Sequence, residues 1–168
     1  MHPIWQSIYA GKWYSTHAKP LRQARLAAKH LCWQLNQSDS ADNGREALLK
    51  QLCPNVASLE IGQQFYCDYG FNIHSKGHVN IGAKMVILDA GLVELGENLT
   101  VGDEAVICGL HHPKDFRKRS QGLQRAEPVI IGTNVTLGNR VTVLPGVTIP
   151  DYTVVTDNVV VSRHLFKK

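Results

Sequence analysis

The sequence lacks the long apolar segments that membrane-spanning helices require. Nowhere in its 168 residues does an apolar run approach the ~20 residues that cross a bilayer as a helix. The N-terminal stretch MHPIWQSIYAGKWY also lacks a basic segment followed by an apolar one, the pattern of a secretion signal. From these absences we expect a cytoplasmic protein that does not insert into membranes.

Cysteine is sparse, and its spacing carries no pattern. The four cysteines, Cys32, Cys53, Cys67 and Cys108, form no CxxC pair and no metal-finger spacing. This argues against a disulfide framework and against a zinc finger. We expect reduced and mostly buried thiols.

Long blocks of one charge sign are absent too. The net charge is +4, and the basic residues are spread along the chain, with small clusters at 117–119 and at Arg163, Lys167 and Lys168. Small clusters suit an anionic small molecule, such as a phosphorylated cofactor, better than a long polyanion. We therefore expect no nucleic-acid partner. At 168 residues, the chain is long enough for one cored domain and a small appendage. Its 43% apolar and 19% charged residues are typical of a globular chain.

Residues 1–55 have helical patterning. Pro20 suits the first turn of a helix that places Leu21, Ala24, Ala28 and Leu31 on one face. The polar stretch 36–43 predicts a loop, and residues 44–52 predict a second short helix that ends before Pro54. We expect an N-terminal helical region over 1–55.

From about residue 59 onward the pattern changes to a period of six. In the last third, apolar residues recur at every sixth position: Ile131, Leu137, Val143, Ile149, Val155 and Val161. The same spacing links Leu95, Val101 and Ile107, and it extends in two registers back to Ile61. Glycine follows many of these residues directly: Gly62, Gly82, Gly96, Gly102, Gly132 and Gly138.

A period of six fits neither an α-helix nor a flat amphipathic strand. It is typical of a parallel β-helix, in which each hexapeptide makes one short strand and one corner, three to a coil. The periodic residue points into a narrow prism and stacks on its counterpart in the next coil, about 4.8 Å away. Small residues and glycines are expected to turn the corners. A β-sandwich of short strands is the alternative, but it does not explain six consecutive hits at strict spacing.

The period fails between Ile107 and Ile131. The intervening segment 109–128 is polar and basic, so it cannot enter the prism and is expected to project as a loop. Loops held by a rigid scaffold often carry function. The predicted organisation is therefore a β-helix over 56–168 with one projecting loop at 109–128.

These features together resemble the maltose/galactoside O-acetyltransferases, a family of hexapeptide-repeat acyltransferases. The resemblance covers nearly the whole chain and rests on segments at residues 10–14, 69–74, 87–89, 112–113, 131–135 and 145–149. His112-Pro113 in the projecting loop is the pair that points to acetyl transfer. The resemblance implies a left-handed β-helix, a homotrimer with active sites between subunits, acetyl-CoA as co-substrate, no metal, and a sugar-like acceptor near the N-terminal helices.

The resemblance also assigns roles to individual residues. His112 matches the family's catalytic histidine, a side chain suited to take the proton from an attacking hydroxyl; by residue type alone it is an exposed loop histidine. The acceptor pocket would contain Tyr14, Arg25 and Asp89, although Asp89 could equally cap a corner and Arg25 could tie the helix to the β-helix. The cofactor side would contain Thr136, Gly138, Asn139, Asp157 and Arg163, where Arg163 would meet a phosphate or remain a solvated charge.

Several positions depart from the family pattern. Thr136 stands where a tryptophan is usual, and 156–158 reads Thr-Asp-Asn where Gly-Ala-Gly is common. Gly82 and Thr16 replace an asparagine and an acidic residue of the acceptor side. These changes leave the fold prediction unaltered but put the affinity for the cofactor and the identity of the acceptor in doubt.

Two other functions stay open at this point. One is a non-catalytic trimeric scaffold or ligand-binding protein derived from such an enzyme. The other is a zinc hydro-lyase, because His74 and His78 lie four residues apart and related β-helix carbonic anhydrases bind zinc through interfacial histidines. That spacing would place both histidines together on a helix, but here they fall in coil corners, so the metal site is the weaker interpretation.

Overall fold

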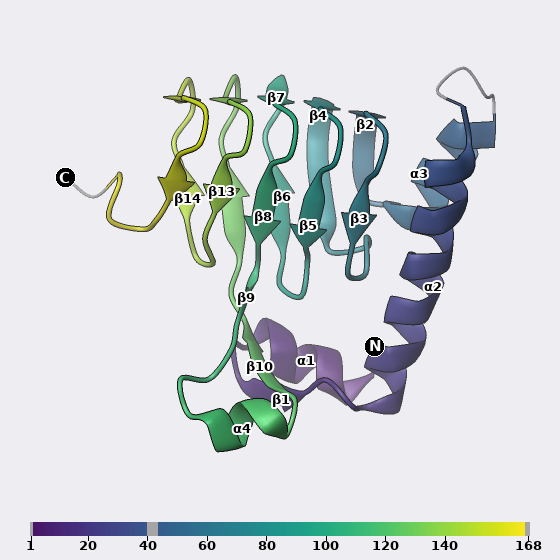
Figure 1. The fold of residues 1–168 in the computed structure, drawn as a ribbon, viewed down its shortest axis with the longest axis vertical. Helices are drawn as coiled ribbons and strands as arrows, with labels where there is room; N and C mark the ends of the chain where they lie inside the picture. The colour runs from purple at the N-terminus through teal and green to yellow at the C-terminus, as the bar shows by residue number, and fades with distance from the viewer. Residues whose placement is uncertain (1, 40–43, 167–168) are drawn as a thin grey trace.

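The computed structural model describes residues 2–39 and 44–166, which form a β-helix with helices at the end where its first coil lies and beside a projecting arm (Figure 1). The N-terminal third contains α1 (Pro3–Tyr9), β1 (Trp13–Ser15), α2 (Lys19–Gln37) and α3 (Gly44–Leu52). Within the described residues, no helix combines the length and the apolar character needed to cross a membrane.

Helix α2 is longer than the sequence pattern predicts. It buries Leu21, Ala28, Cys32 and Leu35 on one face, and it continues to Gln37 through residues expected to form a loop. The reason is a tertiary contact: the Asn36 side chain donates to the carbonyl of Phe65 at 3.0 Å and accepts from its N–H at 2.9 Å. The predicted loop therefore begins too early, and its residues 40–43 lie outside the described part. Helix α3 has the predicted bounds.

The β-helix has three faces, each made of short parallel strands from successive coils. The first face contains the start of β4 (Ile73–Ile81), β6 (Val93–Leu95), β11 (Val129–Ile131) and β14 (Thr148–Ile149). The second face contains β2 (Val56–Ile61), the end of β4, β7 (Leu99–Val101), β12 (Thr136–Leu137) and β15 (Val154–Val155). The third face contains β3 (Tyr66–Cys67), β5 (Val86–Leu88), β8 (Val106–Cys108), β13 (Thr142–Val143) and β16 (Val160–Val161).

The six-residue period produces the core as predicted. Strand register pairs periodic residues one coil apart, Ile131 with Ile149 and Val143 with Val161, and all four are buried. Their branched side chains fill the narrow interior of the prism, where burial of apolar surface supplies most of the stabilisation. The prediction of a hexapeptide-repeat β-helix is confirmed.

The corners are built only partly as predicted. Glycine takes the left-handed backbone position at Gly70 and Gly146, but among the described residues eight non-glycine residues take it as well: Gln64, Lys84, Asn98, Glu104, Asn134, Arg140, Tyr152 and Asn158. The glycines that follow the periodic residues serve close stacking instead. A Cβ on Gly96 would lie 2.1 Å from the carbonyl oxygen of Gly132 in the next coil. The coils thus approach so closely at these points that there is no room for a side chain.

Replacement of Gly96 by alanine is expected to lower the free energy of unfolding by about 2–3 kcal/mol, because the added methyl overpacks two backbones that cannot move apart without breaking strand pairing. Thermal or urea unfolding followed by circular dichroism measures the change. Thr100→Ala, an exposed strand position in β7, is the matched control and should change stability by less than about 0.5 kcal/mol. Equal effects of the two substitutions would contradict the stacking explanation.

The predicted loop is an arm with its own structure. Residues 109–128 contain β9 (Leu110–His111), α4 (Phe116–Ser120) and β10 (Leu123–Ala126). Strand β10 pairs antiparallel with both β9 and β1, so the arm is joined to the N-terminal region (Figure 1). Strand β1 itself lies within a segment expected to be helical. Three residues show no period that would distinguish a strand, and β1 forms because β10 supplies a partner.

Candidate functional site

The arm leaves the β-helix between the third face and the first, at the edge that we call the arm edge (residues 69–72, 89–92, 109–128 and 144–146). Strand β8 ends at Cys108 and β11 begins at Val129. His112 directly follows β9, and its side chain is exposed. No hydrogen bond or ion pair joins it to another residue in the described ranges. An exposed imidazole at the base of a projecting arm is available to a ligand or to a neighbouring subunit.

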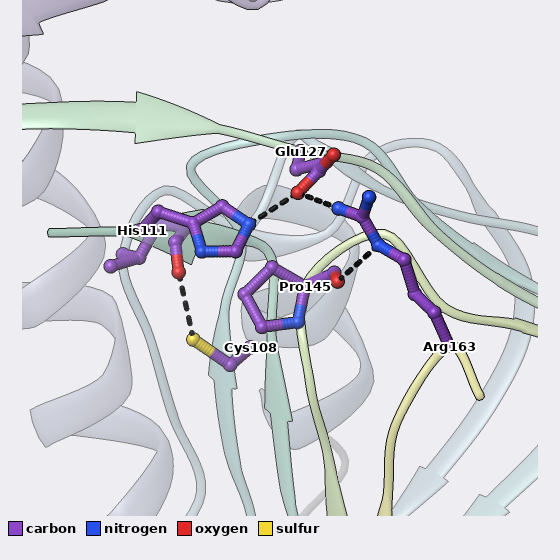
Figure 2. Close-up of polar contacts among 6 residues, drawn as sticks. Cys108, His111, Glu127, Pro145 and Arg163 are labelled. Carbon is purple, nitrogen blue, oxygen red and sulfur yellow. Dashed lines mark hydrogen bonds and ion pairs between the residues drawn. The ribbon is translucent and has the colours of Figure 1, made fainter. Parts of the chain in front are cut away.

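The neighbouring His111 is the histidine with a partner. Its Nε2 contacts Oε2 of Glu127, and the same carboxylate oxygen contacts Nη2 of Arg163 (Figure 2). The Arg163 Nε also donates to the carbonyl of Pro145 at 3.3 Å. One carboxylate therefore holds both the first strand of the arm and the segment after the last coil. His111 therefore belongs to this network.

Glu127 remains ionised in this setting. Partial burial acts to raise its pKa, but the hydrogen bonds from His111 and Arg163 and the positive charge of Arg163 outweigh burial, so the pKa of Glu127 lies below its usual range. Because β9 continues directly into His112, a fixed His111 also restricts where His112 can point.

The three candidates for the acceptor side, Tyr14, Arg25 and Asp89, are brought together around Tyr69. Nη1 of Arg25 donates to the Tyr69 hydroxyl at 2.9 Å, and its Nη2 donates to the carbonyl of Thr16 at 2.6 Å. Tyr14 is buried in the same apolar cluster as Tyr69. Burial raises the pKa of Tyr14 above its ordinary value, and the nearby Tyr69 hydroxyl adds to this. Arg25 thus ties α2 to the β-helix and also faces a polar group at the arm edge.

Asp89 is fully buried. Its Oδ1 accepts from the backbone N–H of Tyr69 at 2.8 Å, and its Oδ2 accepts from that of Asn72 at 3.3 Å. This is a corner-capping geometry, the structural alternative that the sequence left open. Burial raises the pKa of Asp89 to about 6, although the Tyr69 N–H opposes the shift. Contact between Asp89 and an acceptor stays a prediction.

The raised pKa makes stability depend on pH. In the unfolded chain Asp89 loses its proton near pH 4, whereas in the folded protein it keeps the proton to about pH 6. The folded state binds more protons in this window, so the free energy of unfolding should fall by an amount on the order of 3 kcal/mol between pH 4 and pH 6, then level off. Urea titrations across this range should show a smaller decline for Asp89→Asn than for the unsubstituted chain. Identical slopes would show that Asp89 does not titrate as described.

The residues expected on the cofactor side, apart from Arg163, lie at or beside another edge, between the second face and the third. At this Asn139 edge (residues 82–84, 102–104, 138–140 and 156–158) side chains cap the adjacent coil in a ladder. The Ala83 N–H donates to Asp103 Oδ1 at 2.8 Å, the Asp103 N–H to Asn139 Oδ1 at 2.9 Å, and the Asn139 N–H to Asp157 Oδ1 at 2.8 Å.

The ladder explains the aspartate that departs from the family pattern. Hydrogen bonds from the Asn139 N–H and side chain hold the pKa of Asp157 below its usual value, so its charge is retained. A Cβ on Gly138 would lie 2.3 Å from Oδ1 of Asp157, which leaves no room for a larger residue. Thr136 on β12 is exposed on the second face. Asn139 and Asp157 therefore have a structural task at the edge where a cofactor was expected.

Within one chain the candidate residues do not converge on a single site. His112 and Arg163 are at the arm edge, whereas Gly138, Asn139 and Asp157 are at the Asn139 edge, separated from it by the third face. A rigid prism cannot bring two of its edges together. The residues could meet only across two copies of the chain.

A cavity of about 780 Å³ lies beside the arm edge, between α1 and the β-helix. Apolar groups of Ile8, Phe71 and Leu92 line it together with Arg125 and Glu127. Its volume is in the range of ligand-binding pockets. Glu127 therefore joins this cavity to the His111 and Arg163 network.

The two histidines considered above as metal ligands, His74 and His78, are not part of a metal-binding cluster among the described residues. His74 and His78 are both exposed on β4, and His78 Nδ1 is 3.0 Å from Ser58 Oγ. Among the described residues, no group of three or more His, Cys, Asp or Glu side chains is placed to hold a metal ion.

Sequence reasoning missed the roles of Glu127 and Tyr69. Glu127 lies 16 residues from His111 and 36 from Arg163, and no local spacing predicts that three such residues meet. Tyr69 is within a segment that carried the resemblance, but nothing in that segment indicates that it bonds to Arg25. Both contacts depend on how the arm and α2 fold back onto the prism.

Comparisons with known proteins agree with this architecture. Residues 8–57 match the family model described as the maltose acetyltransferase hexapeptide capping motif. A Staphylococcus aureus protein named as an acetyltransferase is 32% identical over 95% of this chain and 82% of its own length. The chain belongs to the maltose/galactoside O-acetyltransferase family. The predicted family is thus confirmed.

Solved structures of the family superpose well on the chain. The maltose O-acetyltransferase of Clostridium difficile has a TM-score of 0.86 at 29% identity, covering 92% of this chain and 83% of its own. A galactoside acetyltransferase in complex with coenzyme A has a TM-score of 0.79 at 28% identity, covering 94% of this chain and 80% of its own. The enzyme therefore shares its fold with its relatives almost from end to end.

Proposed function

We propose that the enzyme transfers an acetyl group from acetyl-CoA to a hydroxyl of a sugar or glycan precursor, with His112 as the general base. The observation that carries this proposal is the exposed imidazole of His112 at the base of an arm whose geometry is held by the Glu127 network, in a chain of the O-acetyltransferase family. A cytoplasmic location is part of the same proposal.

The chemistry requires a base because an alcohol is a weak nucleophile. As the acceptor oxygen attacks the thioester carbonyl, its proton passes to His112. The C–S bond then breaks, and the leaving sulfur takes this proton from the His112 imidazolium, so that coenzyme A is released as a thiol. Backbone N–H groups would stabilise the developing oxyanion. Transfer in a ternary complex needs no covalent enzyme intermediate. His111 acts through position: paired with Glu127, it restricts the strand that carries the base.

The active form is proposed to be a homotrimer with sites between subunits. Its support is the separation of the candidate residues on two edges of one prism. Around a threefold axis the arm edge of one subunit can face the Asn139 edge of the next, so that His112 and the cofactor residues belong to different chains. Tyr14 and Arg25 would then flank the acceptor.

At the cofactor side, Thr136, Gly138 and Asn139 would lie along the pantetheine and nucleotide of acetyl-CoA. The guanidinium of Arg163 already pairs with the carboxylate of Glu127. A cofactor phosphate can therefore bind Arg163 only if it joins that carboxylate or replaces it. Asp157 brings negative charge near an anionic ligand and favours weaker binding than in relatives that carry small residues there.

That charge is also the observation in favour of a second candidate, a non-catalytic scaffold that has lost its cofactor. Binding and turnover separate the two. Acetyl-CoA at about 100 times its Kd should stabilise the folded protein by about 2.7 kcal/mol and raise Tm by roughly 5–10 °C. Thiol release from acetyl-CoA, measured over a panel of sugars and sugar nucleotides, should identify an acceptor. If acetyl-CoA causes no Tm shift and no acceptor in the panel causes thiol release, the scaffold is favoured.

A further inference from the structure

Three cysteine thiols meet where α2, the end of α3 and the first coil pack together. Sγ of Cys32 on α2 is 3.8 Å from Sγ of Cys67 on β3, in van der Waals contact. Cys53, just after α3, also contacts the Cys67 thiol. The fourth cysteine, Cys108, lies apart at the arm edge, where its thiol donates to the carbonyl of Leu110 at 3.4 Å. All four are free thiols.

Cys32 and Cys67 form part of the wall of a cavity of about 460 Å³ between α2 and β3. Three cationic side chains of α2 line the same cavity: Arg22, Arg25 and Lys29. Asp68 is the acidic residue of the lining, and burial raises its pKa. Positive charge beside a thiol stabilises its thiolate, the reactive form, whereas the carboxylate of Asp89 acts on Cys32 and Cys67 in the opposite direction.

The two thiols are not equivalent. The two sulfurs share one contact in which either can donate; this contact lowers the pKa of Cys32 despite burial, and it raises the pKa of Cys67. Cys32 is therefore the better nucleophile, and Cys67 is placed to attack it afterwards. Cys32 is almost completely buried, so its oxidant has to be small enough to enter the cavity.

We propose that Cys32 and Cys67 are a redox-active thiol pair that hydrogen peroxide converts into an intrachain disulfide. The Cys32 thiolate attacks one peroxide oxygen: an S–O bond forms, the O–O bond breaks, and hydroxide leaves while the sulfur loses two electrons. The Cys67 thiol then attacks the Cys32 sulfur. An S–S bond forms, the S–O bond breaks, and the oxygen leaves as water with the Cys67 proton. A dithiol reductant reverses the reaction.

The test uses the reduced full-length chain and hydrogen peroxide. After alkylation of the remaining thiols, the intact mass should show that two of the four cysteines carry no alkyl group. Peptide mapping should find Cys32 joined to Cys67. Dithiothreitol should restore all four thiols. Cys108→Ser should leave the disulfide unchanged, whereas Cys67→Ser should replace it with sulfenic or higher oxides on Cys32.

The cationic cavity has its own test, which does not alter any cysteine. Arg22 and Lys29 are exposed, so the double substitution R22E/K29E should fold, and it should slow disulfide formation about tenfold. Lys118→Glu, on helix α4 and outside the lining of this cavity, is the control for a charge reversal elsewhere and should leave the rate unchanged.

Three outcomes in the unsubstituted chain would overturn the proposal. The first is a disulfide that contains Cys53 or Cys108, and the second is sulfinic acid on Cys32 while Cys67 stays reduced. The third is that peroxide oxidises neither Cys32 nor Cys67 until the protein unfolds. An equal rate in R22E/K29E and in Lys118→Glu would remove the role of the cationic cavity. Because wild-type peptide mapping decides the pairing, the result does not depend on whether the cysteine variants fold.

Discussion

Replacement of His112 by alanine is expected to lower kcat for acetyl transfer by about 10²- to 10⁴-fold. The loss follows from the chemistry, because without an imidazole at this position the acceptor hydroxyl must give up its proton to water. The KM for acetyl-CoA should change little, since the substitution removes a proton acceptor and leaves the Asn139 edge intact. Thiol release under saturating acceptor measures both constants.

Two histidine controls separate this role from general effects. His30→Ala, on the exposed face of α2, should keep kcat within about twofold. His111→Ala should fall between the two, with kcat down about tenfold, because it frees the strand that carries His112 without removing the base. If His112→Ala keeps full activity while folding normally, the proposed mechanism is wrong; if His111→Ala loses more than His112→Ala, the paired histidine is the base.

Mixing two impaired variants should restore part of the activity if the sites lie between subunits. His112→Ala removes the base. Thr136→Glu places a negative charge on the second face, beside the proposed cofactor path, and should raise the KM for acetyl-CoA at least about tenfold. In trimers mixed one to one, about a quarter of the sites receive His112 from one chain and Thr136 from its neighbour. Chains that carry the same tag, co-expressed in equal amounts and purified without selection for mixed trimers, provide such trimers for assay at low acetyl-CoA.

A matched mixture distinguishes shared sites from sites within one chain. Wild-type chains mixed with the double variant H112A/T136E should also have about a quarter of their sites intact if each site is shared. Sites within one chain predict about a half for this mixture and almost none for the two single variants together. A mixture of single variants no more active than its parents would therefore contradict intersubunit sites.

The architecture of the prism was predictable because it depends on local repetition. A side chain such as Val143 is buried because its position in a hexapeptide points inward, and every coil repeats that geometry without reference to distant residues. The bounds of α3 were predictable too, because they depend on residues near one another in the chain. Strand β1 and the end of α2 were not predictable, since each depends on a partner far along the chain: β10 in one case and Phe65 in the other.

The site divides in the same way. The arm was predicted, and His112 was singled out, because a polar, basic insertion breaks an apolar period and carries a recognisable pair; the catalytic role of His112 stays a prediction. The geometry around it was not found. Glu127 joins His111 to Arg163 only after the arm has folded back onto the last coil.

By itself, the sequence determined a β-helix of stacked hexapeptides, its helical N-terminal region and the arm with His112, since each is encoded by residues near one another in the chain. Only the tertiary structure decided that His111 has a partner, that Asp89 and Asp157 cap corners, that two cysteine thiols touch, and that the candidate catalytic and cofactor residues lie on separate edges. These features arise where coils, helices and arm meet, and the contacts between such distant segments leave no periodic signal in the sequence.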